Sequence, residues 1–308
     1  MMCRARGRDS LIILWLLLVS AGNLGASQAS SAQATPAPPA DPSPCLTDLP
    51  PPGSREDEHA LATGLPSGFV MDVLATADVD RLPASPAFLQ LTRLTLEPGA
   101  GSETRLAGGP ILYYVLSGMV TVYVDGTPAV VEPARALLVP SASLYALANE
   151  SDGESIVFRL ALVPQTDDGQ IMVMPTAESV LPIPPSSTPQ SEPLYSAEIT
   201  MLPAPGARLF LACVEWEAAD AALGDRAFPG PVGLRVERGQ IRIDDALTLD
   251  VGGCSLIEGS AVHRIAASAE LPVVLVFGVI PAGAPLWASP TQATVGPPPA
   301  PERLRCGG

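Results

Sequence analysis

The abundance of proline and glycine is the feature that most limits how this chain can fold. The 308 residues include 35 prolines and 27 glycines, and both residue types are unfavourable in the interior of a helix. Between them stand short runs in which apolar and polar residues alternate, as in strands buried on one face. We therefore expect an all-β chain of many short strands joined by turns.

Alternation and turn residues locate several of these strands. The run from Val120 to Val124 alternates valine with other residues and leads into Asp125-Gly126, a strong two-residue hairpin pattern. Further runs of strand length cover residues 136–140, 156–163, 241–243, 247–251 and 273–280. Residues 71–82 form the one stretch in which we expect a short helix.

The N-terminal segment is typical of a secretory signal peptide. Three arginines in the first eight residues precede an apolar run at 11–19, and small residues follow. A membrane anchor is the alternative, but nine apolar residues are too few to span a bilayer. Cleavage is expected after Ala34, with Ala29 as a second possibility. The mature protein is then secreted or otherwise extracytoplasmic, without membrane insertion.

Proline-rich segments divide the rest of the chain into two blocks. The expected division is a signal peptide at 1–34, a disordered lead-in at 35–64, a first domain at 65–177, a Pro/Ser-rich linker at 178–193, a second domain at 194–283 and a Pro-rich tail at 284–308.

The charge balance excludes one class of partner. The net charge is −15, with 32 acidic residues against 17 arginines and no lysine. Nucleic-acid binding needs a basic surface that neutralises phosphates, so we expect no nucleic-acid partner.

Four cysteines remain after removal of the signal peptide, and they allow three disulfide pairings. Because chain ends often lie close together, we predict that Cys45 pairs with Cys306 and that Cys213 pairs with Cys254. The alternative for Cys213 and Cys254 is a pair of buried thiols. No two cysteines have the spacing of a thiolate metal site.

The two blocks repeat one another. Gly118 and Gly239 each begin a similar alternating run, and Arg105 and Arg226 each stand 13 residues before their glycine. An internal duplication explains this common spacing.

The spacing resembles that of the cupin superfamily, specifically two-domain bicupins. In the first block, residues at the two cupin motifs are Gly99, Arg105, Ala107, Ile111, Gly118, Ala134, Pro140, Ala142, Tyr145 and Asn149. In the second block they are Asp220, Arg226, Phe228, Val232, Gly239, Gly252, Glu258, Ser260, His263 and Ala267. The resemblance implies two cupin-type jelly-roll β-barrels in tandem, and the match is weaker in the second block.

The metal-binding positions of the family hold different residues here. Metal-binding cupins use three histidines and a glutamate, whose lone pairs suit manganese, iron, nickel or zinc. The corresponding residues are Arg105, Ala107, Ile111 and Tyr145 in the first block, and Arg226, Phe228, Val232 and His263 in the second. Most of them have no lone pair to offer, so we expect no metal and no cofactor, and the oxalate decarboxylase and dioxygenase activities of the family do not carry over.

Two groups of residues could still bind or react. Arg105 and Tyr145 would offer a guanidinium and a hydroxyl at the mouth of the first barrel, suited to a carboxylate or a sugar. Alternatively, Arg105 pairs with an acidic residue and fills the site. In the second block, Arg226, Glu258 and His263 could form an acid–base cluster, as in metal-free sugar epimerases of the superfamily. The alternative is a structural histidine.

The sequence thus predicts a secreted, metal-free bicupin that acts as a small-molecule binding or structural module, with a small anionic or sugar-like ligand. A metal-independent, epimerase- or isomerase-like enzyme on a small acid or sugar, centred on His263, is the alternative. A third possibility is a storage or envelope protein with filled barrels, similar to metal-free seed globulins. The oligomeric state is left open.

Overall fold

The computed structural model describes residues 61, 65–164, 174–175, 180–182, 184–203, 206–218, 221–259, 262–268, 271–287, 302–304 and 306. The predicted signal peptide, its cleavage sites and Cys45 lie outside these residues. Every element bounded within them is a β-strand, which confirms the expected all-β class. No helix in this part is long and apolar enough to cross a membrane.

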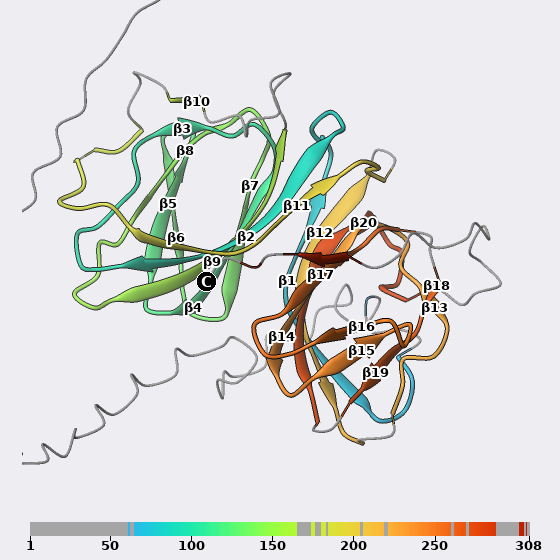
Figure 1. The fold of residues 1–308 in the computed structure, drawn as a ribbon. Helices are drawn as coiled ribbons and strands as arrows, with labels where there is room; N and C mark the ends of the chain where they lie inside the picture. Colours follow the sequence, from blue (N-terminus) through green and yellow to red (C-terminus); the bar gives the residue numbers. More distant parts are fainter. Residues whose placement is uncertain are drawn as a thin grey trace, which may run out of the picture. The chain divides into compact units, whose positions relative to one another are not determined.

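The first barrel consists of two antiparallel sheets (Figure 1). One sheet has the order β11 (Gln190–Ile199), β2 (Ala87–Leu96), β9 (Ser155–Pro164), β4 (Ile111–Ser117), β7 (Arg135–Val139). The other has the order β10 (Met174–Pro175), β3 (Arg105–Leu106), β8 (Leu144–Ala148), β5 (Val120–Val124), β6 (Thr127–Val131). The chain alternates between the sheets so that β9 pairs with β2 and β4, while β8 pairs with β3 and β5. This is the strand order of a jelly roll.

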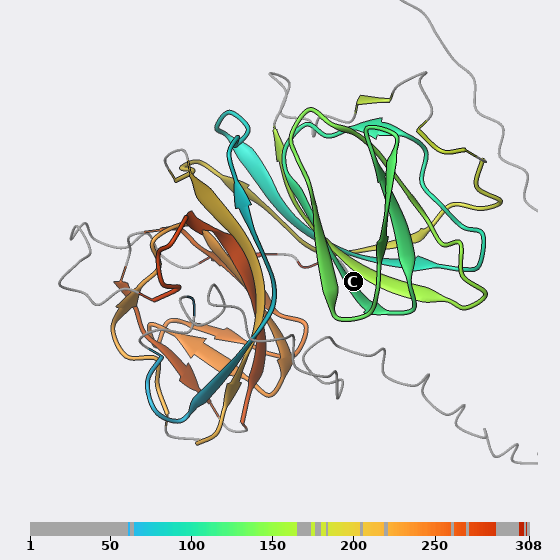
Figure 2. The same ribbon diagram turned by 180° about the vertical axis from the view of Figure 1, so that it is seen from behind.

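The second barrel repeats this order (Figure 2). Its larger sheet runs β1 (Phe69–Val79), β12 (Ala207–Trp216), β20 (Val273–Pro281), β14 (Val232–Arg238), β17 (Cys254–Ile257), β21 (Glu302–Leu304). Opposite it are the pair β13 (Arg226–Ala227) and β18 (Val262–His263), and the sheet β16 (Leu247–Leu249), β15 (Ile241–Ile243), β19 (Ile265–Ala267). Together β18 and β19 take the place of β8. The expected two jelly-roll barrels are therefore present.

Equivalent turns support the duplication. Gly118 and Gly239 have φ angles of 73° and 72°, a left-handed conformation that glycine adopts readily. Asp125-Gly126 joins β5 to β6 with both φ angles positive, and Asp244-Asp245 follows β15 with φ angles of 52° and 56°. Two positive φ values are typical of the hairpin turn whose twist matches its strands.

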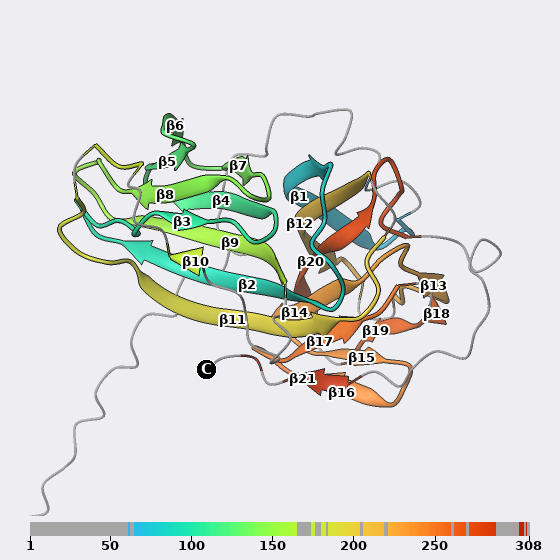
Figure 3. The same ribbon diagram turned by 90° about the horizontal axis from the view of Figure 1, so that it is seen from above.

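The barrels exchange their first strands. β1 pairs along its length with β12 of the second barrel, and β11 pairs with β2 of the first (Figure 3). The domain ranges 65–177 and 194–283 thus each begin with a strand that belongs to the other barrel. The last residues of the predicted linker, from Gln190 onward, are part of β11.

Two other expectations at the edges of the blocks differ from the structure. The helix expected at 71–82 is wrong, because β1 forms strand pairs with β12 from Phe69 to Val79, and such pairing overrides a weak local preference. Within the predicted disordered lead-in, Leu61 is fully buried, and its carbonyl accepts a hydrogen bond from the Leu286 amide at 3.3 Å.

Alternate residues of each strand contribute to different cores. In β9, Val157 and Ala161 belong to the interior of the first barrel, whereas Phe158 and Leu160 belong to a separate cluster. That cluster also contains apolar side chains of β1, β12 and β20, so one face of each large sheet shares a core. The continuous apolar runs of strands such as β9 and β20 therefore reflect sheets that are buried on both faces.

Both predicted disulfide pairings are wrong. Cys254 is bonded to Cys306, with the two Cα atoms 6.1 Å apart. The cause is the pairing of β21 with β17, in which Leu304 lies opposite Cys254, so the C-terminal segment returns to the second barrel. Cys213 is also disulfide-bonded, and Cys254 is not its partner.

Candidate functional site

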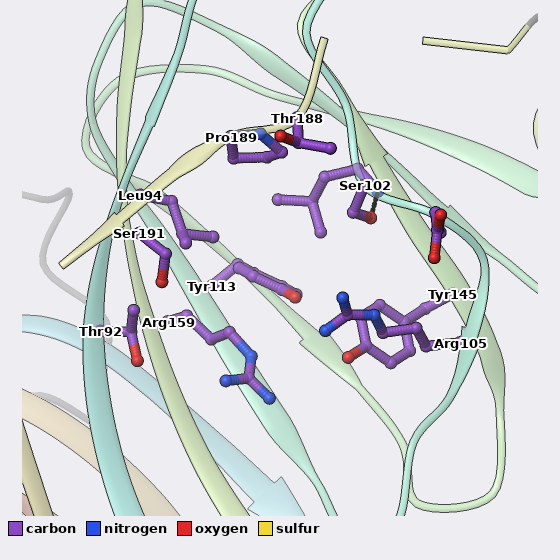
Figure 4. Close-up of a pocket in the computed structure, with 12 residues that line it drawn as sticks. Thr92, Leu94, Ser102, Arg105, Tyr113, Tyr145, Arg159, Thr188, Pro189 and Ser191 are labelled. Atoms are coloured by element: carbon purple, nitrogen blue, oxygen red, sulfur yellow. Dashed lines mark hydrogen bonds between the residues drawn. The ribbon is translucent and has the colours of Figure 1, made fainter. Parts of the chain in front are cut away.

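A cavity of about 350 Å³ lies in the first barrel (Figure 4). Its walls come from both sheets of the barrel and from the segment that leads into β11. The lining residues that carry charge or a phenol are Glu103, Arg105, Tyr113, Tyr145 and Arg159. Apolar walls with a few polar groups are typical of small-molecule sites.

The two residues predicted for this site, Arg105 and Tyr145, lie together. They are opposite each other in the antiparallel pair of β3 and β8, which places their side chains on the same face. Both are directed into the cavity (Figure 4). The strand pairing of Arg226 with His263 in the second barrel is equivalent, as the repeated spacing indicated.

Arg159 and Tyr113 line the opposite wall of the cavity. Neither residue was predicted from the sequence to belong to the site. They are opposite each other in the pair of β4 and β9. Arg159 is the one charged residue in the inward-facing row of β9, between the buried side chains of Val157 and Ala161. A half-buried cation in an apolar row is costly unless a counter-charge or hydrogen bonds compensate it.

The cavity offers mainly hydrogen-bond donors. Burial raises the pKa of the Tyr113 phenol, and nearby Tyr145 raises it further, while Arg159 and Arg105 act in the opposite direction. Tyr113 therefore keeps its proton at neutral pH and can donate it. The rings of Tyr113 and Tyr145 lie close, with centroids 6.5 Å apart, so two hydroxyls and two guanidiniums can act together.

No acidic residue of the described chain neutralises either guanidinium. The ion pairs found there involve other arginines, such as Arg93 with Glu192 and Arg208 with Asp78. Glu103 lines the cavity from an exposed position but forms no ion pair with Arg105 or Arg159 within these residues. Among the described residues, the structure therefore gives no support to the alternative in which Arg105 fills the site by pairing with an acid.

The segment before β11 forms part of the cavity wall. Thr188, Pro189 and Ser191 line the cavity. The segment is held by backbone hydrogen bonds, from Gly101 N to Ser187 O at 2.9 Å and from Ser186 N to Gly99 O at 3.0 Å. Residues that the sequence analysis assigned to a linker thus help to shape the candidate site.

The second barrel places His263 beside an aspartate. His263 is only 3% exposed, and its Nδ1 lies 2.6 Å from Asp244 Oδ2. The other oxygen of Asp244 accepts a hydrogen bond from the Arg264 amide at 2.8 Å. Nε2 of His263 is buried and has no hydrogen-bond partner among the described residues.

The other members of the predicted acid–base cluster contact different groups. Glu258 accepts a hydrogen bond from Thr200 Oγ1 at 3.3 Å. Arg226 is paired with His263 through the strand backbone. In the described part of this barrel the interior contains an apolar core that includes Phe228 and Trp287, whose ring centroids are 5.1 Å apart. Asp244, rather than Glu258, is therefore the acidic partner of His263.

The residues at the family's metal positions do not fit a metal ion. In the first barrel, Ala107 and Ile111 are buried in the hydrophobic core, and Arg105 is a permanent cation. In the second, Phe228 and Val232 are equally buried, which leaves His263 as the one imidazole at these positions. The described residues contain no group of three or more His, Cys, Asp or Glu side chains suited to a metal.

Comparison with known proteins gives matches in structure alone. No family model and no curated protein matches the sequence. Similar solved structures include oxalate decarboxylase from Bacillus subtilis (12% identity, 72% of this chain and 75% of that chain, TM-score 0.42). Salicylate 1,2-dioxygenase from Pseudaminobacter salicylatoxidans is also similar (12% identity, 61% and 70%, TM-score 0.37). A third is a cupin 2 conserved barrel domain protein from Leptotrichia buccalis (13% identity, 66% and 88%, TM-score 0.34).

These neighbours are cupin-superfamily proteins, the family that the motif spacing resembles. At such identities and TM-scores, their activities say nothing about what this chain binds. The site must therefore be interpreted from its own residues.

Proposed function

We propose that the first barrel is a metal-independent binding site for a small organic anion, in an extracytoplasmic protein. The observation that carries this proposal is Arg159, a cation in an apolar inward-facing row that opens on a cavity and has no acidic partner in the described chain. A bound carboxylate would supply the missing counter-charge and accept hydrogen bonds from the guanidinium.

The neighbouring groups suit the same ligand. Tyr113 lies beside Arg159 in the strand pair and keeps its proton, so its hydroxyl can donate to the second oxygen of a carboxylate. A neutral sugar would instead need acceptors as well as donors, and Glu103 is the one carboxylate that lines the cavity. The donor excess therefore favours an anion over a sugar.

A catalytic role for His263 is the second candidate function, because Asp244 fixes its ring and leaves Nε2 without a partner. An Asp–His pair is suited to proton transfer when a substrate can reach the free nitrogen. The apolar packing around Phe228 and Trp287 disfavours such access, so the binding function is preferred.

Calorimetric titration of the full chain with butyrate, benzoate and glucose tests the proposal. We expect a carboxylate to bind and glucose not to bind, and we expect Arg159→Gln to weaken carboxylate binding by about tenfold or more, since a charge-assisted hydrogen bond contributes about 1.5–3 kcal/mol. Arg135→Gln is the matched control, because Arg135 is exposed on β7 of the same barrel and does not line the cavity. Tight glucose binding, or equal effects of the two variants, would contradict the proposal.

A further inference from the structure

The cavity of the first barrel carries a guanidinium on each of its two walls. Arg105 belongs to β3 in one sheet, and Arg159 belongs to β9 in the other. Both line the cavity, and neither forms an ion pair within the described residues. Facing sheets lie about 10 Å apart, so the two cations approach the cavity from opposite sides.

We propose that the ligand of this cavity is a short-chain dicarboxylate, with one carboxylate bound by Arg159 and the other by Arg105. The inference rests on the proposed anion-binding function and adds the number and placement of the negative charges. A single carboxylate accepts a two-pronged contact from one guanidinium, which would leave Arg105, an exposed residue at the cavity, in contact with solvent alone. Two separated carboxylates neutralise both.

The other residues that line the cavity fit such a ligand. Tyr113 is adjacent to Arg159, and Tyr145 is adjacent to Arg105, so each carboxylate would meet one guanidinium and one phenol. Leu94 and Leu147 also line the cavity and provide apolar contact for a methylene chain. A dicarboxylate combines both kinds of group, since it has charged ends and an apolar chain.

The size of the cavity is consistent with this class. A volume of about 350 Å³ compares with about 30 Å³ for one water molecule in the liquid. The cavity therefore has room for a ligand of on the order of ten non-hydrogen atoms, which includes the dicarboxylates from malonate to adipate.

Glu103 provides an internal test of the charge argument. Its carboxylate lines the cavity from an exposed position, where it repels an anionic ligand. Removing this charge should help a dianion more than a monoanion, since the repulsion scales with the ligand charge. Glu103→Gln is thus expected to raise affinity by a few-fold, in the opposite direction to the arginine variants.

The experiment is calorimetric titration of the full chain with malonate, succinate, glutarate and adipate, each compared with its monomethyl ester. We expect at least one diacid to bind about tenfold or more tightly than its ester, the advantage of a second charge-assisted contact. Arg105→Gln should bring the ratio of the two affinities close to one, whereas Arg135→Gln should leave it unchanged. Circular dichroism of each variant checks its fold. If an arginine variant misfolds, Glu103→Gln provides a second test, because it should raise the affinity for the diacid more than the affinity for the monoester.

The possible outcomes distinguish failure of the dicarboxylate inference from failure of the proposed anion-binding function. If diacids and monoesters bind equally well, the dicarboxylate inference is overturned and anion binding stands. If no carboxylate binds, both are overturned. Inorganic phosphate that binds more tightly than every diacid would also overturn the inference, because it places both charges at one centre.

Discussion

At the scale of single residues, Glu150 shows how hydroxyl donors fix a carboxylate on the first barrel. Tyr123 O–H donates to Oε1 at 2.6 Å, and Thr121 Oγ1 donates to Oε2 at 2.7 Å. The hydrogen bond from Tyr123, followed by that from Thr121, lowers the pKa of Glu150. Both donors lie on the face of β5 that turns away from the barrel interior, between the inward-facing residues Val120, Val122 and Val124.

Replacing Tyr123 by phenylalanine should lower stability in a pH-dependent way. Loss of one hydrogen bond is expected to reduce the free energy of unfolding by about 1 kcal/mol at neutral pH. A carboxyl whose pKa is lowered on folding stabilises the native state above its unfolded pKa, and this contribution is lost as the pH falls through the folded pKa. The difference between wild type and Tyr123→Phe should therefore shrink in acid, as urea unfolding at neutral pH and at about pH 3 would show.

Tyr195→Phe is the matched control for this prediction. It removes the same hydroxyl from a buried side chain, but the Tyr195 hydroxyl has no hydrogen-bond partner among the described residues. The control should show no comparable loss at neutral pH. A Tyr123→Phe effect that stays constant across the pH range would contradict the assignment.

Asn149 illustrates how a residue pattern can suggest a modification that the fold opposes. Residues 149–151 have the spacing of a glycosylation site, yet Asn149 is fully buried. Its Nδ2 donates to Leu96 O at 2.9 Å and to Gly153 O at 2.7 Å, and its Oδ1 accepts from Ser151. A sugar would replace one of the two Nδ2 hydrogens and so remove at least one of these bonds at a fully buried site; in the folded protein the side chain serves the turn.

At the scale of strands, the sequence predicted which segments form strands better than it predicted which strands pair with each other. Alternation located β5 and β15, and apolar runs located β7, β9 and β20, because each of these strands has its own local pattern. It could not reveal that β1 pairs with β12, or that β11 pairs with β2. Those pairings depend on which sheet edge lies free in space, and no residue within β1 or β11 encodes that information locally.

The sequence predicted two of the four charged or phenolic residues that face one another in the candidate site, because only those two stand at motif positions. Arg105 and Tyr145 stood at positions that the family motif marks. Arg159 stood inside an apolar run of β9 that we interpreted only as a buried strand. Tyr113 is followed by a second tyrosine in β4 and lies outside the motif positions, so nothing distinguished it from a core side chain. The one usable indication was Arg159 itself, the single charged residue between Ile156 and Val163, since an unexplained charge in a core strand is costly.

The strand exchange predicts that the two halves of the chain hold together after a break between them. A protease site inserted at residues 167–170, followed by cleavage under reducing conditions, should leave both fragments in one peak on native size exclusion. Separation of the fragments would break two strand pairings, that of the eleven-residue β1 with β12 and that of the ten-residue β11 with β2. The fragments should separate only in denaturant. Two folded fragments that separate in native buffer would contradict the exchange.

At the scale of the whole molecule, the two barrels share a topology but differ in their interiors. The first keeps a cavity lined by guanidiniums and phenols. The second is packed by a core that reaches from Leu61 to Trp287, and the Cys254–Cys306 bond links its strand β17 to the C-terminal segment. A loop with a sequence separation of 52 residues could gain about 4 kcal/mol from such a bond in the chain-entropy model. The duplication has thus produced one barrel suited to a ligand and one suited to stability.

The same difference bears on metal binding by the molecule as a whole. A transition-metal site needs at least three nitrogen, oxygen or sulfur ligands that converge on one point. The equivalent positions in the first barrel hold one permanent cation, two aliphatic side chains and a phenol, and those in the second hold His263 with Arg226 and two apolar side chains. His263 already directs Nδ1 at Asp244, which leaves a single nitrogen for an ion.

We therefore expect protein purified without a histidine tag to contain far less than one equivalent of manganese, iron, nickel or zinc per chain, as elemental analysis by mass spectrometry would measure. Carboxylate affinity should also be unchanged by 1,10-phenanthroline, a chelator without carboxylates, because the proposed contacts are guanidiniums and phenols rather than a metal ion. His263→Ala provides the control, since it removes the one imidazole from the eight positions. A near-stoichiometric metal that disappears in this variant would show that His263 belongs to a metal centre, and the binding function proposed for the first barrel would then describe only part of the protein.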